Sequence, residues 1–405
     1  MNPKLGSVLS GVPTVRARPL TLDARMERGS LSLEIGGLSM SGCTQSVEAG
    51  VDAGAPAEER LREEVVPFTA GDGLECTLVH VTGDRPGDKG PVLLVHGAGV
   101  RANIFRPPVA MHLVRYLVQA GYDVWLENWR ASIDLPPRRW TLDDAAVFDH
   151  PAAVAKVVER TGARSIKAVI HCQGSTSFTM SAVAGLVPQV DTIVSNAVSL
   201  HPVVPRLSAW KLNYAVPLVS LATASLNPQW GLRPETLPAK ALSAFVRWSH
   251  HECDSAVCKW ASFTYGSGFP TLWRHENLDV PTHDWIAGEF GFVPLTFFRQ
   301  MARCVRHGRL RPTGKHPALS PDLADKAPRT RARFALIAGQ LNECFLPESQ
   351  RLTFEYLRRH TRRAHHSLHV VPGYGHLDVF IGRNAIHDVY PIIARELLAP
   401  ADRAS

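Results

Sequence analysis

The strongest constraint on the fold is an alternation of short apolar segments with amphipathic ones. Apolar runs occur at residues 91–99, 122–129, 165–174 and 189–200, and helical patterns lie between them. A short run that is apolar throughout suits a strand buried on both faces of a parallel sheet. The alternation therefore predicts an α/β fold, with a mostly parallel sheet and helices on both of its faces.

The alternation is interrupted once and then resumes. Residues 201–330 are rich in Trp, Pro and His and show no strand rhythm, and the alternation returns in 331–400. We therefore predict a core of residues 63–200 and 331–400 with a large inserted lid or cap, 201–330. Such insertions often cover the carboxyl ends of the strands, where sites in α/β folds lie. Residues 1–62 include part of a small, polar and alanine-rich stretch, 46–64, which predicts that they form a flexible or loosely packed arm.

A nucleophile is predicted at the corner that follows the third apolar run. The sequence IHCQG, residues 170–174, takes the chain from a strand through a small-residue turn into a helix. Such a turn exposes Cys172 at a helix N-terminus, where the partial positive charge lowers the pKa of a thiol. The backbone N–H of Gln173 is then placed to bind a developing oxyanion. Ile170 stands where such turns normally have glycine.

Two further strand ends supply partners for this chemistry. The sequence VHGAG, residues 95–99, is typical of an oxyanion loop, and the N–H of Ala98 is the predicted second donor. The sequence GYGHLD, residues 373–378, places His376 in a glycine-flanked loop after a late strand, which suits a catalytic base.

The residue that orients this histidine has two candidates. The sequence GQLNE, residues 339–343, has Asn342 where an aspartate is expected, and Glu343 follows it. In one interpretation Glu343 is the acid. In the other, Asn342 orients the imidazole, as an amide does in the cysteine–histidine–asparagine proteases. An amide can suffice for a cysteine, because a thiol is far more acidic than a hydroxyl group.

Several blocks together resemble a known family. GYDVWLENWRAS (121–132), FDHPAAVAKVVERTG (148–162) and IHCQGSTSF (170–178) are similar to segments of the acid lipases of the lysosomal and gastric type. The hydrolase-like halves attached to some cholesterol-oxidase-type flavoproteins are more similar still. The resemblance implies an α/β-hydrolase fold and points to lipid or sterol-ester substrates. Intracellular polyhydroxyalkanoate depolymerases and polyester synthases also use a cysteine at this turn, which leaves a polyester or thioester substrate open.

We therefore predict a cysteine-nucleophile hydrolase or acyltransferase that acts on a hydrophobic acyl ester, polyester or thioester through a covalent acyl-enzyme. The alternative is a non-catalytic protein of the same fold that binds a lipid-like ligand or a partner. Aromatic residues of the lid are predicted to line an apolar substrate pocket. They are Trp210, Trp230, Trp248, Trp273 and Phe297.

Composition limits the remaining possibilities. The 405 residues contain seven cysteines in a scattered, odd-numbered set, which predicts reduced thiols and, without a signal-peptide-like N-terminus, a cytoplasmic protein. Cys253 and Cys258 have no partners at zinc-site spacing, so no metal is predicted, and no cofactor motif occurs. No apolar run is long enough for a transmembrane helix.

The formal net charge of +7 does not by itself indicate nucleic-acid binding, and no nucleic-acid partner is predicted. The basic stretch 351–366 is predicted to be a solvated helix face, and it leaves transient contact with a lipid surface open. No oligomeric state is predicted.

Overall fold

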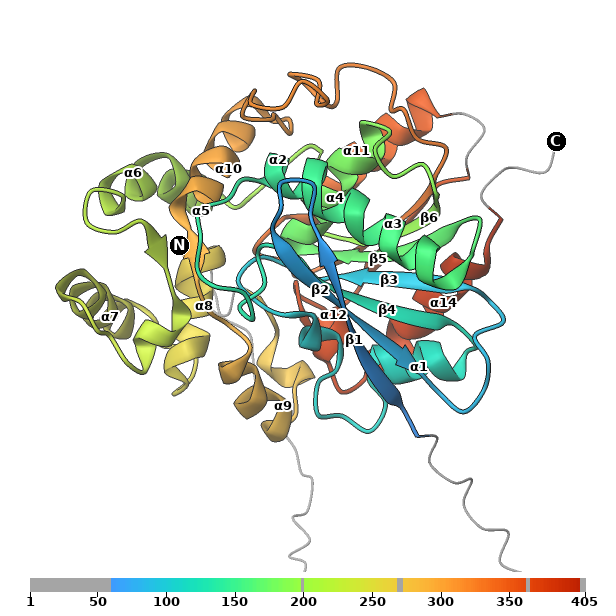
Figure 1. Ribbon diagram of the computed structural model, residues 1–405. Coiled ribbons are helices and arrows are strands. Elements are labelled where there is room, and N and C mark those ends of the chain that lie inside the picture. Colours follow the sequence, from blue (N-terminus) through green and yellow to red (C-terminus); the bar gives the residue numbers. More distant parts are fainter. Residues whose placement is uncertain (1–59, 198–199, 268–271, 362–364, 401–405) are drawn as a thin grey trace, which may run out of the picture. The chain divides into compact units, whose positions relative to one another are not determined.

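An eight-stranded sheet is the framework of the protein (Figure 1). The computed structural model describes residues 60–197, 200–267, 272–361 and 365–400. The predicted N-terminal arm lies almost entirely outside the described residues. Across the sheet the strands are ordered β1 (Arg62–Thr69), β2 (Glu75–Thr82), β4 (Asp123–Asn128), β3 (Pro91–Val95), β5 (Ile166–His171), β6 (Val190–Asn196), β9 (Arg333–Gly339) and β10 (Ser367–Val371).

The sheet is mostly parallel, as the alternation predicted. Strand β2 pairs antiparallel with its neighbours β1 and β4, and every other neighbouring pair in this sheet is parallel. Residues of β3 and β9 are buried throughout, which explains why these strands read as unbroken apolar runs. The carboxyl ends of the parallel strands therefore meet along one edge of the sheet, where the sequence placed the candidate site.

Helices cover both faces of the sheet (Figure 1). Helices α3 (His150–Thr161) and α4 (Cys172–Val183) lie on one face, and α1 (Leu113–Gln119) and α14 (Tyr390–Leu398) lie on the other. Pro151 occupies the first turn of α3, and Gly162 ends that helix in the left-handed conformation with φ of 68°. The remaining helices of the core are α2 (Leu142–Asp144), α11 (Pro347–His360), α12 (Asp378–Ile381) and α13 (Ala385–Asp388).

A buried ion pair joins two of the three lipase-like blocks of the sequence, residues 121–132 and 148–162. Nε of Arg130 donates to the carboxylate of Asp149 at 2.9 Å, and the same guanidinium contacts Asp72. Arg130 and Asp149 are both buried, and their pairing satisfies charges that would otherwise be costly inside the protein. These residues connect the turn after β4 to the start of α3, which is a structural role.

The chain between β6 and β9, hereafter the inserted segment, is mainly helical. Among its described residues, the α-helices are α5 (Arg206–Trp210), α6 (Val216–Val219), α7 (Leu237–Ser249), α8 (Ala256–Tyr265), α9 (Val280–Trp285) and α10 (Leu295–His307). Two short strands, β7 (Ser225–Leu226) and β8 (Val293–Pro294), pair antiparallel, although the sequence showed no strand rhythm here. That this segment acts as a lid stays a prediction. Within the described part of the chain, every helix is too short or too polar to cross a bilayer.

Candidate active site

Cys172 lies at a sharp corner between β5 and α4. Its φ of 57° is in the left-handed region, which a non-glycine residue enters only when the surrounding structure holds it there. Strand β5 ends at His171, and α4 begins at Cys172 itself. The side chain is therefore presented at the N-terminus of a buried helix, where the first N–H groups have no partner within the helix. Ile170, which replaces the usual glycine, is buried within β5, and the corner forms nonetheless.

Two glycines make room for this corner. A Cβ atom on Gly174 would lie 2.1 Å from the carbonyl oxygen of His96, and one on Gly97 would lie 2.9 Å from Cβ of Cys172. Neither distance is compatible with a side chain, so the loop after β3 and the start of α4 approach each other only because both positions are glycine. The predicted oxyanion loop and Cys172 are brought together by this close packing.

His376 completes the pair that the sequence predicted. One ring nitrogen of His376, one of His171 and the sulfur of Cys172 all lie within 4.8 Å of one another. The Nδ1 atom of His376 is 3.1 Å from Nδ2 of Asn342. Its Nε2 atom is buried and has no hydrogen-bond partner among the described residues. Nε2 is therefore the ring nitrogen that is available to contact Cys172 or a substrate.

Asn342, and not Glu343, is the residue that contacts the histidine. The oxygen Oδ1 of Asn342 accepts hydrogen bonds from the backbone N–H groups of Cys344 at 2.9 Å and Phe345 at 3.1 Å. These two donors fix the amide, so that its NH₂ group faces His376. Glu343 is only half-buried, and no hydrogen bond joins it to His376 in the described structure.

This orientation of the amide determines where His376 carries its proton. An NH₂ group can only donate, so Nδ1 of His376 accepts, and the proton of the neutral ring is on Nε2. A carboxylate at the same place would accept from Nδ1 and hold the opposite tautomer. The amide therefore does not reproduce the orienting function of an aspartate.

The environment of Cys172 favours its thiolate. The neighbouring Cys344 thiol lowers the pKa of Cys172 well below its usual value, and His376 lowers it further, although burial acts in the opposite direction. The pKa of Cys344 is raised correspondingly, chiefly by Cys172. Sequence reasoning missed Cys344, although its place two residues after Asn342 was a signal that it would share the site.

The predicted oxyanion donors, Ala98 and Gln173, lie beside Cys172. A residue of the inserted segment forms a hydrogen bond to Ala98. The small cavity at the sulfur is lined by Ala98, Cys172, His376 and Tyr265, among others. The hydroxyl group of Tyr265 donates to the carbonyl oxygen of Ala98 at 2.9 Å. This hydrogen bond ties the oxyanion loop to α8, and nothing in the sequence pattern singled out Tyr265.

The loop that carries His376 is fixed by an acidic side chain. Asp378 is buried, and its Oδ1 accepts from the backbone N–H of Gly375 at 2.9 Å. The side chain of Asn277, from the inserted segment, donates to the other carboxylate oxygen at 2.6 Å. Beneath the site, a ring nitrogen of His171 pairs with Oδ1 of Asn196 at 2.7 Å. His171 therefore packs under the corner.

An apolar cavity lies next to the small one and shares Tyr265 as a wall. It meets the active site at Gln173 and Cys344, and most of its other lining comes from the inserted segment. The apolar side chains include Leu212, Val216, Val219, Phe263, Leu295, Phe297, Phe298 and Met301.

The predicted aromatic pocket is only partly correct. Phe297 lines the apolar cavity, but the four tryptophans are not among its lining residues in the described structure. Trp210 and Trp248 are exposed, because each lies on the outer face of its helix. Trp230 packs against Trp260 with ring centroids 5.8 Å apart, and Trp273 is buried against Phe290. Both tryptophans pack their apolar surface against the core of the inserted segment. A substrate contact for any of the five stays a prediction.

Comparisons with known proteins agree on the architecture. Residues 90–216 match a family model described as alpha/beta hydrolase fold. The structure of DcsB in complex with a substrate analogue superimposes with a TM-score of 0.53 at 14% identity, covering 83% of this chain and 99% of that one. The chain has the α/β-hydrolase fold.

Two curated relatives match over short stretches. Sterol esterase 2 of Saccharomyces cerevisiae is 26% identical over 133 residues, which are 28% of this chain and 25% of that protein. Human lipase member K is 31% identical over 104 residues, which are 23% of this chain and 26% of that protein. The chain thus matches about a quarter of the length of either relative. The closer likeness to oxidase-attached hydrolase halves stays a prediction.

A second group of cysteine and histidine side chains lies outside the hydrolase-fold core, in the inserted segment. Cys253, Cys258, His275 and His283 each offer a sulfur or nitrogen atom, and these atoms all lie within 4.8 Å of one another. The sequence showed no partners for Cys253 and Cys258 at zinc-site spacing, yet the folded chain places two histidines beside them. Sequence spacing did not reveal these histidines, because they follow at distances that a short motif does not cover and only the packing of the helices brings them close. The prediction that no metal binds here stays untested.

Proposed function

We propose that this protein transfers acyl groups from a hydrophobic acyl ester or thioester through a thioester intermediate on Cys172. The observation that supports this most directly is the corner itself. A cysteine with φ of 57° stands at the start of a buried helix, with the His376 ring beside its sulfur. Such strain persists where it presents a reactive side chain. The fold and the names of the two curated relatives agree with chemistry at an ester bond.

The reaction begins with attack by the thiolate of Cys172 on the carbonyl carbon of the substrate. The backbone N–H groups of Ala98 and Gln173 stabilise the negative charge that develops on the carbonyl oxygen. The carbon–oxygen or carbon–sulfur bond to the leaving group then breaks, and the acyl group remains on sulfur. Water, or another acceptor, resolves this thioester in a second step.

The tautomer of His376 points to the class of leaving group. Because Nδ1 accepts from Asn342, a neutral ring carries its proton on Nε2, and a neutral imidazole is a poor acid. A thiolate leaves without a proton, since thiols have a pKa of about 8.5. An alkoxide needs one, because its conjugate acid is about as weak an acid as water. We therefore propose that thioesters and activated esters are preferred to alkyl esters.

The apolar cavity is the proposed site of the acyl chain. It reaches the catalytic cysteine through Gln173 and Cys344 and is walled by aliphatic and aromatic side chains such as Phe298 and Met301. Burying each methylene group of an acyl chain there contributes about 0.8 kcal/mol. Acyl groups with several methylenes should accordingly be bound better than acetyl groups.

A matched set of substrates tests this function. One acyl group is supplied as a thioester, as an aryl ester and as an alkyl ester, and kcat/KM is measured for each with the wild-type chain and with Cys172→Ala. We expect thioester and aryl ester to be turned over far faster than the alkyl ester, and Cys172→Ala to turn over none. Failure of the wild-type chain to act on any of them, with a Cys172 inert to alkylation, would leave the non-catalytic ligand-binding alternative.

A further inference from the structure

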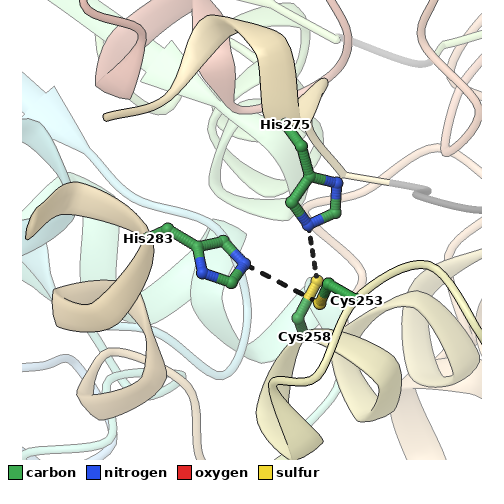
Figure 2. A group of neighbouring side chains, drawn as sticks. All are labelled: Cys253, Cys258, His275 and His283. Atoms are coloured by element: carbon green, nitrogen blue, oxygen red, sulfur yellow. Dashed lines mark hydrogen bonds between the residues drawn. The ribbon is translucent and has the colours of Figure 1, made fainter. Parts of the chain in front are cut away.

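Four side chains from three parts of the inserted segment converge on one point, and Figure 2 shows them turned toward one another. Cys253 precedes α8, and Cys258 lies in its first turn. His275 begins the short 3₁₀ helix η5 (His275–Asn277), and His283 lies in α9. Cys258 is buried and the other three are half-buried, so the group is shielded without being closed off from solvent.

The distances match the edges of a metal tetrahedron. The sulfur of Cys258 lies 3.4 Å from Nε2 of His275, and the sulfur of Cys253 lies 3.8 Å from Nε2 of His283. Zn–S bonds of about 2.3 Å and Zn–N bonds of about 2.05 Å at a tetrahedral angle place sulfur and nitrogen about 3.6 Å apart. The two measured contacts lie on either side of this value.

The ligand types are also consistent with a single metal. Two thiolates and two imidazoles are the soft and intermediate donors that select zinc among the common divalent ions, whereas calcium and magnesium prefer oxygen. The two imidazole rings lie with centroids 5.0 Å apart and are tilted by 53°, so they do not stack face to face. If the two cysteine–histidine pairs were only independent hydrogen bonds, nothing would require the two pairs to lie at the same point.

We propose that Cys253, Cys258, His275 and His283 bind a structural zinc ion. Four protein ligands complete a tetrahedron, which leaves no open position for a substrate and distinguishes the site from a catalytic metal centre. The ion links the N-terminal end of α8 to η5 and α9, which are short elements with little apolar surface of their own. Zinc binding is here independent of whether Cys172 is catalytic.

The site also bears on the position of His376. The backbone carbonyl oxygen of Leu272, three residues before His275, accepts from the N–H groups of His376 at 3.2 Å and Leu377 at 2.7 Å. Asn277, two residues after His275, donates to Asp378. A metal that holds His275 therefore holds the segment that supports the histidine loop. Loss of the metal should slow alkylation of Cys172 without removing any group from the active site.

The first test is the metal content of the full-length chain, purified without an affinity tag that binds metals. We expect about one zinc ion per chain, measured by elemental mass spectrometry. Cys253→Ser and His283→Gln should lose most of it, and Cys172→Ser should keep it. Retention of zinc in Cys253→Ser together with its loss in Cys172→Ser would place the metal at the Cys172 group and overturn the proposal.

A second test uses the wild-type chain and so does not depend on how the variants fold. The zinc is exchanged for Co²⁺, and the visible spectrum is recorded. Intense d–d bands and thiolate charge-transfer bands are expected for a tetrahedral site with two sulfurs. In parallel, Cys253 and Cys258 should resist alkylation until a chelator is added. Free alkylation of both thiols before chelation, or a disulfide between them in the non-reduced peptide map, would show that no metal is held there.

Discussion

Among the residues that the structure describes, cysteine sulfur and histidine nitrogen lie close together in two groups, and the surroundings of the two groups differ. At Cys172 the backbone is strained, the cysteine starts a buried helix, and an amide contacts the histidine. At Cys253 and Cys258 no residue has a positive φ, and two sulfurs face two ring nitrogens. Closeness of sulfur and imidazole is common to a nucleophile and to a metal ligand. Backbone conformation and the number of donors distinguish them.

The difference fits the two roles that we propose for these sites. A nucleophile needs one lone pair free and a path for the substrate, so its cysteine stands at a strand end beside an apolar cavity. A structural metal needs every donor turned inward and no open position. The replacements with the largest expected effects therefore test whether Cys172 takes part in the reaction while the other cysteines have structural roles.

Replacement of Cys172 by alanine is expected to have the largest effect. Removal of the sulfur abolishes covalent catalysis, so kcat/KM for the preferred thioester should fall by at least about 10³-fold. The control is Cys304→Ser, a buried cysteine of α10, which should leave turnover within about threefold once the protein is folded. Equal losses in both variants would mean that the assay reports folding and not chemistry.

Replacement of Gly174 by alanine tests how tightly the core fixes the corner. The new Cβ atom would lie 2.1 Å from the carbonyl oxygen of His96, so the free energy of unfolding should fall by about 3 kcal/mol. The measurement is urea unfolding followed by circular dichroism. Gly288→Ala in the inserted segment is the matched control, because its Cβ would meet nothing within 4 Å, and a change of about 0.5 kcal/mol or less is expected.

Replacement of Asn342 by aspartate should change selectivity more than total activity. A carboxylate can accept from the Nδ1–H of His376 while still accepting from the two backbone N–H groups, so the ring becomes able to protonate an alkoxide from Nε2. The ratio of alkyl-ester to thioester kcat/KM should rise by about 10²-fold. Asn342→Ala, which cannot accept from Nδ1, should not raise it. An unchanged ratio in the aspartate variant would refute the role assigned to the tautomer.

Replacement of Cys344 by alanine should shift the pH dependence of Cys172. The Cys344 thiol lowers the pKa of Cys172, so the reactive thiolate persists as the pH falls and is lost only below that lowered pKa. Without Cys344 the alkylation profile should move to higher pH, so alkylation at a pH on its acid limb becomes slower. Cys344→Ser retains a hydroxyl donor and should lie between the two. A profile that does not move would show that Cys344 does not lower the pKa of Cys172.

Much of the core could be predicted from the sequence because its signals are local. The apolar run that became β3, the proline in the first turn of α3 and the glycine that ends it each act through the backbone of a few residues. The order of Cys172, Asn342 and His376 along the chain was likewise enough to place each at a strand end.

The rest depends on packing between distant segments. Nothing near Asn342 in the sequence shows which end of its amide faces the histidine, because that is decided by the backbone N–H groups of a turn. The tryptophans gave no sign of which would be buried against each other and which exposed. The four-residue cluster escaped notice because His275 and His283 reach the cysteines only through the arrangement of α8, η5 and α9.

The central claim is that Cys172 becomes acylated during turnover. The most direct measurement mixes the wild-type chain with an acyl thioester, quenches in acid and determines the intact mass and the modified peptide. Because the Nε2–H tautomer of His376 is a poor base for water, hydrolysis of the intermediate should be slow, and one acyl group should be found on Cys172. Turnover that proceeds with no acyl group on Cys172, and that continues in Cys172→Ala, would contradict the account.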